Sequence, residues 1–223
     1  MKKYITLVCS ALIIIIGWAC EPSAVFEQPQ PMSAEDEYAF KSKFRGEYIN
    51  TTDSTSLVIR DRFIIKEPSI AFKIPVTEIE NSGLYELSGD SALAFMDEEE
   101  KEWLPVFLRQ DTVYGVQKYI DTVFHISEEN VLRSYKGRYI LNYKLSENRW
   151  DITMLEKQRK NLVITKIEFP QKLEELEEMV DIEKVTDEKG EVQRVLLKPT
   201  KKQLKALLKG DKFKEKEFFR QVD

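Results

Sequence analysis

Between residues 43 and 169 the chain alternates apolar and polar positions with a period of two residues. The clearest case is residues 139 to 145, where large side chains at the odd positions form one apolar face. Weaker versions of this pattern predict strands at 57 to 59, 63 to 65, 72 to 74, 104 to 108, 113 to 118, 122 to 126, 150 to 154 and 162 to 167. Short strands separated by polar turns, such as Asn81-Ser82-Gly83 and Ser88-Gly89-Asp90, predict an antiparallel β-meander sandwich or barrel.

One short segment recurs within this region. Residues 44 to 49 (FRGEYI) are echoed by residues 135 to 140 (YKGRYI). In each copy the glycine permits a tight bend where a strand begins, and the tyrosine two residues later is expected to cap one end of the core. The echo predicts two meanders that pack together, and it leaves open whether 44 to 65 and 135 to 167 are a true repeat.

After Phe169 the pattern changes to a helical period. Leu173, Leu176 and Val180 predict a short amphipathic helix that begins near Pro170. Two strands, 182 to 185 and 192 to 197, follow around a polar turn at 187 to 190.

A second, lysine-rich helix is predicted over residues 200 to 209. Thr200 and Gln203 have the spacing of a capping box, leucines at 204, 207 and 208 form an apolar stripe, and Gly210 marks the end. The predicted fold class is therefore α+β, mainly antiparallel β. A β-rich body over 43 to 169 carries a helix-hairpin-helix tail, 170 to 223, packed on it.

The N-terminus has the pattern of an export signal. Lys2 and Lys3 precede an apolar run over residues 5 to 16, and the run closes on Gly17-Trp18-Ala19-Cys20. A stable membrane span needs about 20 apolar residues, so we expect residues 1 to 19 to be a signal peptide that is cleaved.

The residues around the cleavage point decide how the mature chain begins. Small residues at 17 and 19 before Cys20 resemble the lipobox of bacterial lipoproteins, in which the cysteine receives diacylglycerol before signal peptidase II cuts. The commonest lipobox has leucine where this chain has Gly17, and a small residue there also suits ordinary cleavage to a secreted protein with a free thiol. Because Cys9 lies inside the signal, Cys20 has no disulfide partner in the mature chain, which favours lipidation of Cys20 with fatty acyl chains such as palmitate.

A proline-containing segment follows the cysteine. Residues 21 to 34 include Pro22, Pro29 and Pro31 and few large apolar side chains. This composition predicts an extended spacer without packed structure, part of a tether over residues 20 to 42 that holds the body about 40 Å from the bilayer.

Two resemblances extend this picture. The Gly46-x-Tyr48 opening is similar to the first strand of lipocalin-like barrels, which often begin with Gly-x-Trp, and this likeness implies a ligand-holding cavity. The whole layout resembles uncharacterised exported lipoproteins of the Bacteroidota type, which implies an address in the cell envelope and no particular reaction.

Composition and charge narrow the classes of partner. Aromatic residues make up 11% of the chain and the formal net charge is −5. The first value is typical of a folded chain, and the second argues against nucleic acid as a partner. Residues 171 to 183 hold six acidic residues against Lys172, and residues 198 to 216 hold eight lysines against Asp211 and Glu215. Either the two helices pair, or the lysines contact anionic lipid or polysaccharide, or both faces are solvated.

The catalytic inventory is sparse. His125 is the only histidine, and its strand position between Phe124 and Ile126 places it on the opposite, solvent-facing side. The acidic run from 97 to 102 offers calcium ligands or a glycosidase carboxylate, although we expect it to be a solvated hairpin connection. No cofactor, metal or catalytic residue is predicted.

The sequence therefore favours a non-enzymatic binding or accessory module in the bacterial cell envelope. We expect it to be anchored to a membrane, most simply the outer membrane, through the lipid on Cys20. Its other expected partner is another envelope protein or a polysaccharide. Two alternatives remain: a carboxylate-dependent glycan hydrolase, which requires two facing carboxyl groups about 5 to 9 Å apart, and a carrier of a small apolar ligand, which requires a lined internal cavity.

Overall fold

The computed structural model describes residues 23–83, 85–88, 91–95, 101–169, 173–210 and 214–222. The fold is mainly antiparallel β with a few helices, which confirms the predicted class. The chain divides into two compact units. The first unit holds the chain up to Tyr38, Ile126–Gln158 and Val163–Glu217, and the second holds Ala39–His125, Arg159–Leu162 and Phe218–Asp223. The predicted signal peptide and Cys20 lie outside the described residues.

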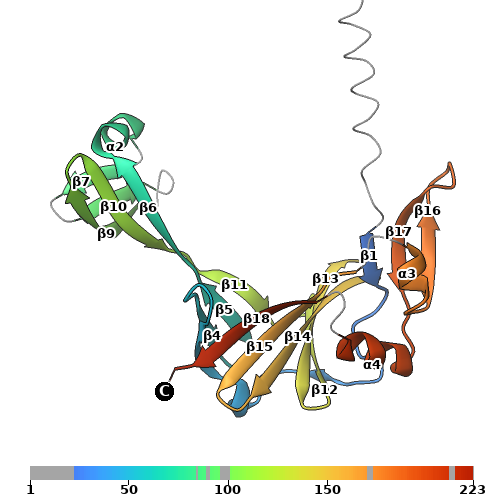
Figure 1. Ribbon diagram of the computed structural model, residues 1–223. Coiled ribbons are helices and arrows are strands. Elements are labelled where there is room, and N and C mark those ends of the chain that lie inside the picture. Colours follow the sequence, from blue (N-terminus) through green and yellow to red (C-terminus); the bar gives the residue numbers. More distant parts are fainter. Residues whose placement is uncertain are drawn as a thin grey trace, which may run out of the picture. The chain divides into compact units, whose positions relative to one another are not determined.

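The first unit is built around one sheet. Its strands and helices are β1 (Ser23–Phe26), β2 (Asp36–Glu37), β12 (Asn130–Tyr135), β13 (Arg138–Ser146), β14 (Arg149–Gln158), most of β15 (Asn161–Ile167), α3 (Leu173–Glu177), β16 (Ile182–Thr186), β17 (Val192–Leu197), α4 (Lys201–Lys209) and the beginning of β18 (Lys214–Gln221). Along the sheet the order is β12-β13-β14-β1-β17-β16, and β15 also pairs with β14 (Figure 1). β1 and β17 run parallel, and the other pairs are antiparallel where their register is given.

Both predicted tail helices contribute to the core of this unit. Leu176 and Val180 from the region of α3, and Leu204, Leu207 and Leu208 from α4, are all buried against strand residues such as Phe26, Ile152 and Val195. The predicted capping box of α4 is confirmed, because Thr200 N donates to Gln203 Oε1 (2.8 Å) and Gln203 N to Thr200 Oγ1 (3.3 Å). Gly210 ends the helix with a φ of −63°, so no left-handed glycine is needed there.

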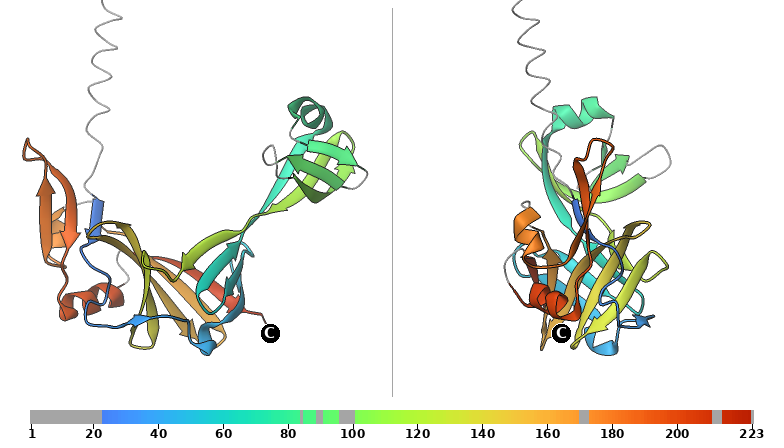
Figure 2. Two further views of the ribbon diagram at one scale, coloured as in Figure 1. Left: turned by 180° about the vertical axis from the view of Figure 1, so that it is seen from behind. Right: turned by 90° about the vertical axis from the view of Figure 1, so that its right-hand side faces the viewer.

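The second unit contains two antiparallel sheets. Its elements are η2 (Ser42–Phe44), β3 (Gly46–Asn50), β4 (Ser56–Ile59), β5 (Phe63–Glu67), β6 (Ser69–Pro75), α2 (Val76–Ser82), β7 (Tyr85–Ser88), β8 (Ser91–Phe95), β9 (Lys101–Arg109), β10 (Thr112–Lys118) and β11 (Asp121–His125). One sheet has the order β11-β5-β4-β3-β18 and the other β6-β10-β9-β8-β7; Figure 2 shows both from two further directions.

The predicted spacer is the main correction. We expected residues 21 to 34 to be unpacked, but β1 begins at Ser23, pairs with β17 in the register Ala24 to Val195, and buries Phe26 completely. The Phe26 ring packs edge-on against Phe169, with centroids 5.6 Å apart. The prediction of an unpacked tether is therefore wrong from Ser23 onward, because Val25 and Phe26, which lie between Pro22 and Pro29, are both buried.

The prolines themselves are held by side chains. Arg133 Nη1 donates to the carbonyl oxygens of Pro29 (2.6 Å) and Pro31 (3.1 Å). Between them, Gln30 N donates to Asn142 Oδ1 (2.6 Å), and Asn142 Nδ2 donates to Gln30 O (2.9 Å). A proline lacks a backbone N–H but keeps its carbonyl acceptor, so a proline-containing segment can still be fixed to a folded surface.

Other differences are local. The expected turn at 81 to 83 is the end of α2, where Gly83 has a φ of 65°. The sequence predicts no strand at β18, because most of its residues are charged and only one of them, Phe219, is fully buried. In the two echoed segments, Tyr48 and Tyr139 are both buried as predicted.

Candidate functional site

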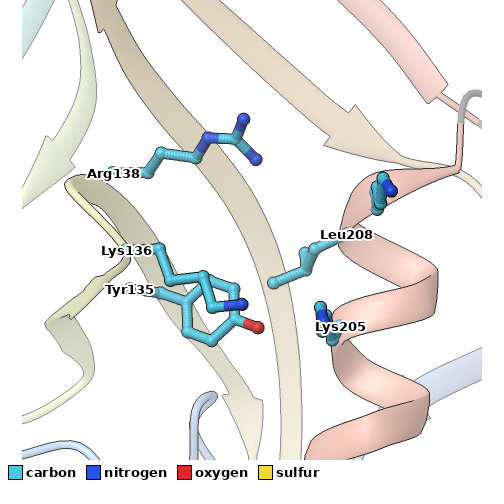
Figure 3. Close-up of a pocket in the computed structure, with 6 residues that line it drawn as sticks. Tyr135, Lys136, Arg138, Lys205 and Leu208 are labelled. Carbon is cyan, nitrogen blue, oxygen red and sulfur yellow. The ribbon is translucent and has the colours of Figure 1, made fainter.

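The first unit has a surface hollow of about 230 Å³ with a strongly cationic rim. It is lined by Tyr135, Lys136 and Arg138 from the β12–β13 hairpin and by Lys205, Leu208 and Lys209 from α4 (Figure 3). We call this site the cationic hollow.

The hairpin side of the cationic hollow is set by a two-residue turn. Lys136 and Gly137 have φ values of 50° and 81°, which is the backbone of a type I′ turn and is favoured by glycine at the second position. The turn pairs Tyr135 directly with Arg138, so that these two side chains lie on the same side of the hairpin. Tyr135 is half-buried against the core, whereas Lys136 is exposed.

The helical side follows from residue spacing in α4. Lys205 and Lys209 are four residues apart and therefore share one face of the helix. Both are exposed, while Leu208 beside them is buried. Lys214 Nζ donates to the carbonyl oxygen of Leu208 at 2.9 Å, which satisfies one of the carbonyl groups left free at a helix C-terminus.

Positive charge in the cationic hollow is only partly neutralised. Arg138 forms a bidentate ion pair with Glu156, with an Nε–Oε2 distance of 3.0 Å and an Nη2–Oε1 distance of 3.1 Å. Lys136 Nζ lies 5.4 Å from the centre of the Tyr135 ring, a cation–π arrangement. Within the described part of the chain, Lys205 and Lys209 have no carboxylate partner. An anion that enters the hollow would meet these two ammonium groups directly.

This arrangement of side chains can bind a small, negatively charged group. Ammonium groups on both sides attract a carboxylate, sulfate or phosphate, while Leu208 and the Tyr135 ring offer an apolar wall (Figure 3). A volume of about 230 Å³ is below the range of typical drug-sized pockets, so it suits one sugar-sized unit.

Of the three alternatives for the charged faces of the tail, pairing between the two helices is not seen among the described ion pairs. Lys184 of β16 binds Glu177 (2.7 Å), and Lys198, between β17 and α4, binds Glu183 (2.5 Å) and Glu27 (3.0 Å). The hydrogen bonds that the Lys198 ammonium donates to the carboxylates of Glu183 and Glu27 raise the pKa of Lys198. Glu177 of α3 thus pairs with strand β16, while the four lysines of α4 are exposed.

The remaining sequence candidates do not converge on this site. His125 is exposed at the end of β11 between buried Phe124 and Ile126, as predicted. Residues 97 to 100 of the acidic run lie outside the described residues, and so does Cys20, so the hydrolase alternative and the lipidation site stay predictions. The described residues contain no group of three or more His, Cys, Asp or Glu side chains placed to hold a metal ion. None of the described helices has the length and apolar character required to cross a membrane.

Sequence reasoning identified the lysine-rich helix but missed the hairpin side of the site. In the sequence, Tyr135, Lys136 and Arg138 stand out only as part of the echoed segment. Their partnership with α4 depends on tertiary packing between segments more than sixty residues apart in sequence, and no local pattern signals it.

A second hollow, of about 450 Å³, lies on the second unit and is lined by Ile49, Lys160, Asn161, Arg220, Gln221 and Val222. Backbone groups around it are already paired, since Gln221 N donates to Lys160 O (2.8 Å) and Val222 N to Glu47 O (2.9 Å). The cationic hollow is the better candidate because Lys205 and Lys209 are exposed and have no carboxylate partner among the residues that the structure describes.

Comparison with known proteins gives no relative from which a role could be transferred: no protein-family model matches this chain, and neither the curated proteins nor the solved structures yield a match.

Proposed function

We propose that this chain is a lipid-anchored bacterial envelope protein that acts as a non-enzymatic binding module for an acidic polysaccharide. The observation that supports the binding role is the cationic hollow. In it, Lys205 and Lys209 of α4 lie opposite the Tyr135–Arg138 hairpin, and Leu208 and the Tyr135 ring form a small apolar wall. Uronate or phosphorylated sugars combine one negative charge per unit with an apolar ring face, and this combination matches both features of the hollow.

The anchor part of the proposal rests on the sequence. The basic start, the short apolar run and Gly17-Trp18-Ala19-Cys20 together resemble a lipoprotein signal. An anchored location also gives the binding role a reason, because a tethered module meets envelope polymers at a high effective concentration. The outer membrane is the simplest location for such a module.

The binding role predicts that Lys205→Ala with Lys209→Ala weakens binding of tetragalacturonate, a short acidic oligosaccharide, by about tenfold. Two charge-assisted contacts at a solvent-exposed rim are together worth about 1 to 2 kcal/mol, and 1.4 kcal/mol corresponds to tenfold. Alanine preserves helix propensity, so α4 remains folded. Isothermal titration at low salt measures the change.

The matched control removes the same charge from the same helix outside the hollow. Lys201→Ala with Lys202→Ala changes neither wall of the site, and both residues are exposed. We expect less than a twofold effect from this pair, in line with screening of distant surface charges. Equal losses of affinity for the two pairs would show that the overall charge of α4, and not the cationic hollow, determines binding. No binding by the unmodified protein would refute an acidic polysaccharide ligand.

A further inference from the structure

The distance between the proposed anchor and the folded surface is very short. Ser23 already pairs with Arg194 of β17, and only three residue steps separate it from Cys20. A fully extended chain spans at most about 3.6 Å per residue, so the anchor lies within about 11 Å of the sheet. This inference rests on the proposed lipidation of Cys20.

The strand direction identifies which part of the first unit faces that anchor. β1 runs parallel to β17, so its first residue lies beside the beginning of β17. Val192 precedes Arg194 by two residues, about 7 Å along a strand, and the turn at residues 187 to 191 lies beyond it. The tip of the β16–β17 hairpin therefore extends beyond Ser23 by a distance similar to the greatest length, about 11 Å, of the three residue steps between Cys20 and Ser23.

The hairpin tip is a hydrogen-bonded turn that carries no apolar side chain. The Asp187 carboxylate accepts hydrogen bonds from Lys189 N (2.9 Å), Glu191 N (2.9 Å) and Gln193 Nε2 (3.1 Å), and these bonds lower its pKa. The turn residues Glu188 and Lys189 are exposed. Charged side chains are costly in the hydrocarbon core of a bilayer but stable among headgroups. The tip is suited to lie on the headgroup layer without entering the acyl chains.

The opposite end of β17 carries α4. This strand is six residues long, about 20 Å, and α4 begins shortly after it, tied to the start of β16 by a hydrogen bond from Gln203 Nε2 to Asp181 Oδ1 (2.9 Å). The ribbon views agree that α4 and the tip of the β16–β17 hairpin lie at opposite ends of the hairpin (Figures 1 and 2).

We propose that the β16–β17 hairpin tip rests on the lipid headgroups of the membrane that holds Cys20, and that the α4 end of the first unit is turned away from that membrane. The acidic excess of the tip, from Asp187, Glu188 and Glu191 against Lys189, fits amine-bearing zwitterionic headgroups better than anionic ones. Under this arrangement the cationic hollow faces ligands that come from the solvent and does not bind the headgroups beneath it.

Site-specific fluorescence quenching tests this orientation. Cys9 and Cys20 are the only cysteines, and neither leaves a free thiol in the mature lipidated form, so Lys189→Cys provides a unique labelling site. The purified lipoprotein carries a fluorophore at this site and is placed in phosphatidylethanolamine–phosphatidylglycerol vesicles that contain a headgroup spin-labelled lipid. We expect the label at 189 to lose most of its fluorescence. Lys202→Cys on α4 removes the same charge, and its label should lose none above background.

A spacer variant separates orientation from simple proximity. Twenty Gly/Ser residues inserted between Pro22 and Ser23 have a mean span of about 25 Å, so quenching at 189 should disappear. Equal quenching at 189 and 202, or quenching that survives the spacer, would overturn the orientation. Mass analysis of the same samples distinguishes a wrong orientation from a wrong anchor. A protein that carries no acyl chains and does not bind vesicles would refute the lipid anchor itself.

Discussion

If Cys20 carries the proposed lipid anchor, replacing Cys20 by serine should abolish the mature, membrane-bound form of the protein. A serine hydroxyl does not form the thioether that carries diacylglycerol, so the lipoprotein peptidase has no substrate. The loss is large because each buried methylene contributes about 0.8 kcal/mol and stable anchoring requires more than one acyl chain. We expect the mature band to disappear from the membrane fraction and to be replaced by uncleaved precursor or by a soluble, differently cleaved product. Fractionation followed by gel mobility measures this.

The chain offers a matched control at its other cysteine. Cys9→Ser lies in the apolar part of the predicted signal, where serine costs little hydrophobicity and no chemistry depends on the thiol. It should leave processing and membrane binding unchanged. A Cys20→Ser protein that is processed to the same species and remains in the membrane to the same extent would show that the assignment is wrong.

The second large effect is on stability. Phe26→Ala should lower the free energy of unfolding of the first unit by about 3 to 5 kcal/mol, the usual cost of removing a large core aromatic. Phe26 is fully buried, packs against Phe169, and joins strand β1 to the cluster that includes the leucines of α4. Urea unfolding of the purified mature protein in detergent measures the change.

Tyr38→Ala serves as the comparison for this substitution. Tyr38 belongs to the same unit but is 79% exposed, so its removal should change stability by less than about 0.5 kcal/mol. The pair tests the packed N-terminal segment. If residues 21 to 34 were an unpacked spacer, Phe26→Ala would be as mild as Tyr38→Ala.

The sequence allows the strands to be predicted best where the two faces of the sheet differ. β17 occupies the residues expected, because its apolar positions lie next to a clear turn with Gly190. The capping residues Thr200 and Gln203 allow the start of α4 to be predicted, since this motif depends only on local hydrogen bonds. Local patterns are sufficient in both cases.

Elements that depend on distant partners could not be predicted in this way. β1 is a strand of four residues followed by prolines, and it is stabilised by its pairing with β17 and β14 and by the burial of Phe26. β18 is dominated by charged residues, and its place is set by pairing with β3 and by burial of Phe219. In the same way, the hairpin side of the cationic hollow follows from packing against α4 and has no signature in its own sequence.

The packed β1 also changes the meaning of the anchor. A free tether would leave the folded chain about 40 Å from the bilayer with no fixed direction. With β1 in the sheet, only three residue steps separate the proposed lipid anchor at Cys20 from the first unit, so we expect such an anchor to determine which end of the unit faces the membrane. The proposed anchoring at Cys20 and the exposure of the cationic hollow to solvent are therefore linked.

Intact-mass and fragment analysis of the mature N-terminus tests the central claim most directly. The account predicts a chain that begins at Cys20, with diacylglycerol on its sulfur atom. An N-terminal peptide with a free, unacylated Cys20 thiol, or a mature chain that begins at another residue, would contradict it.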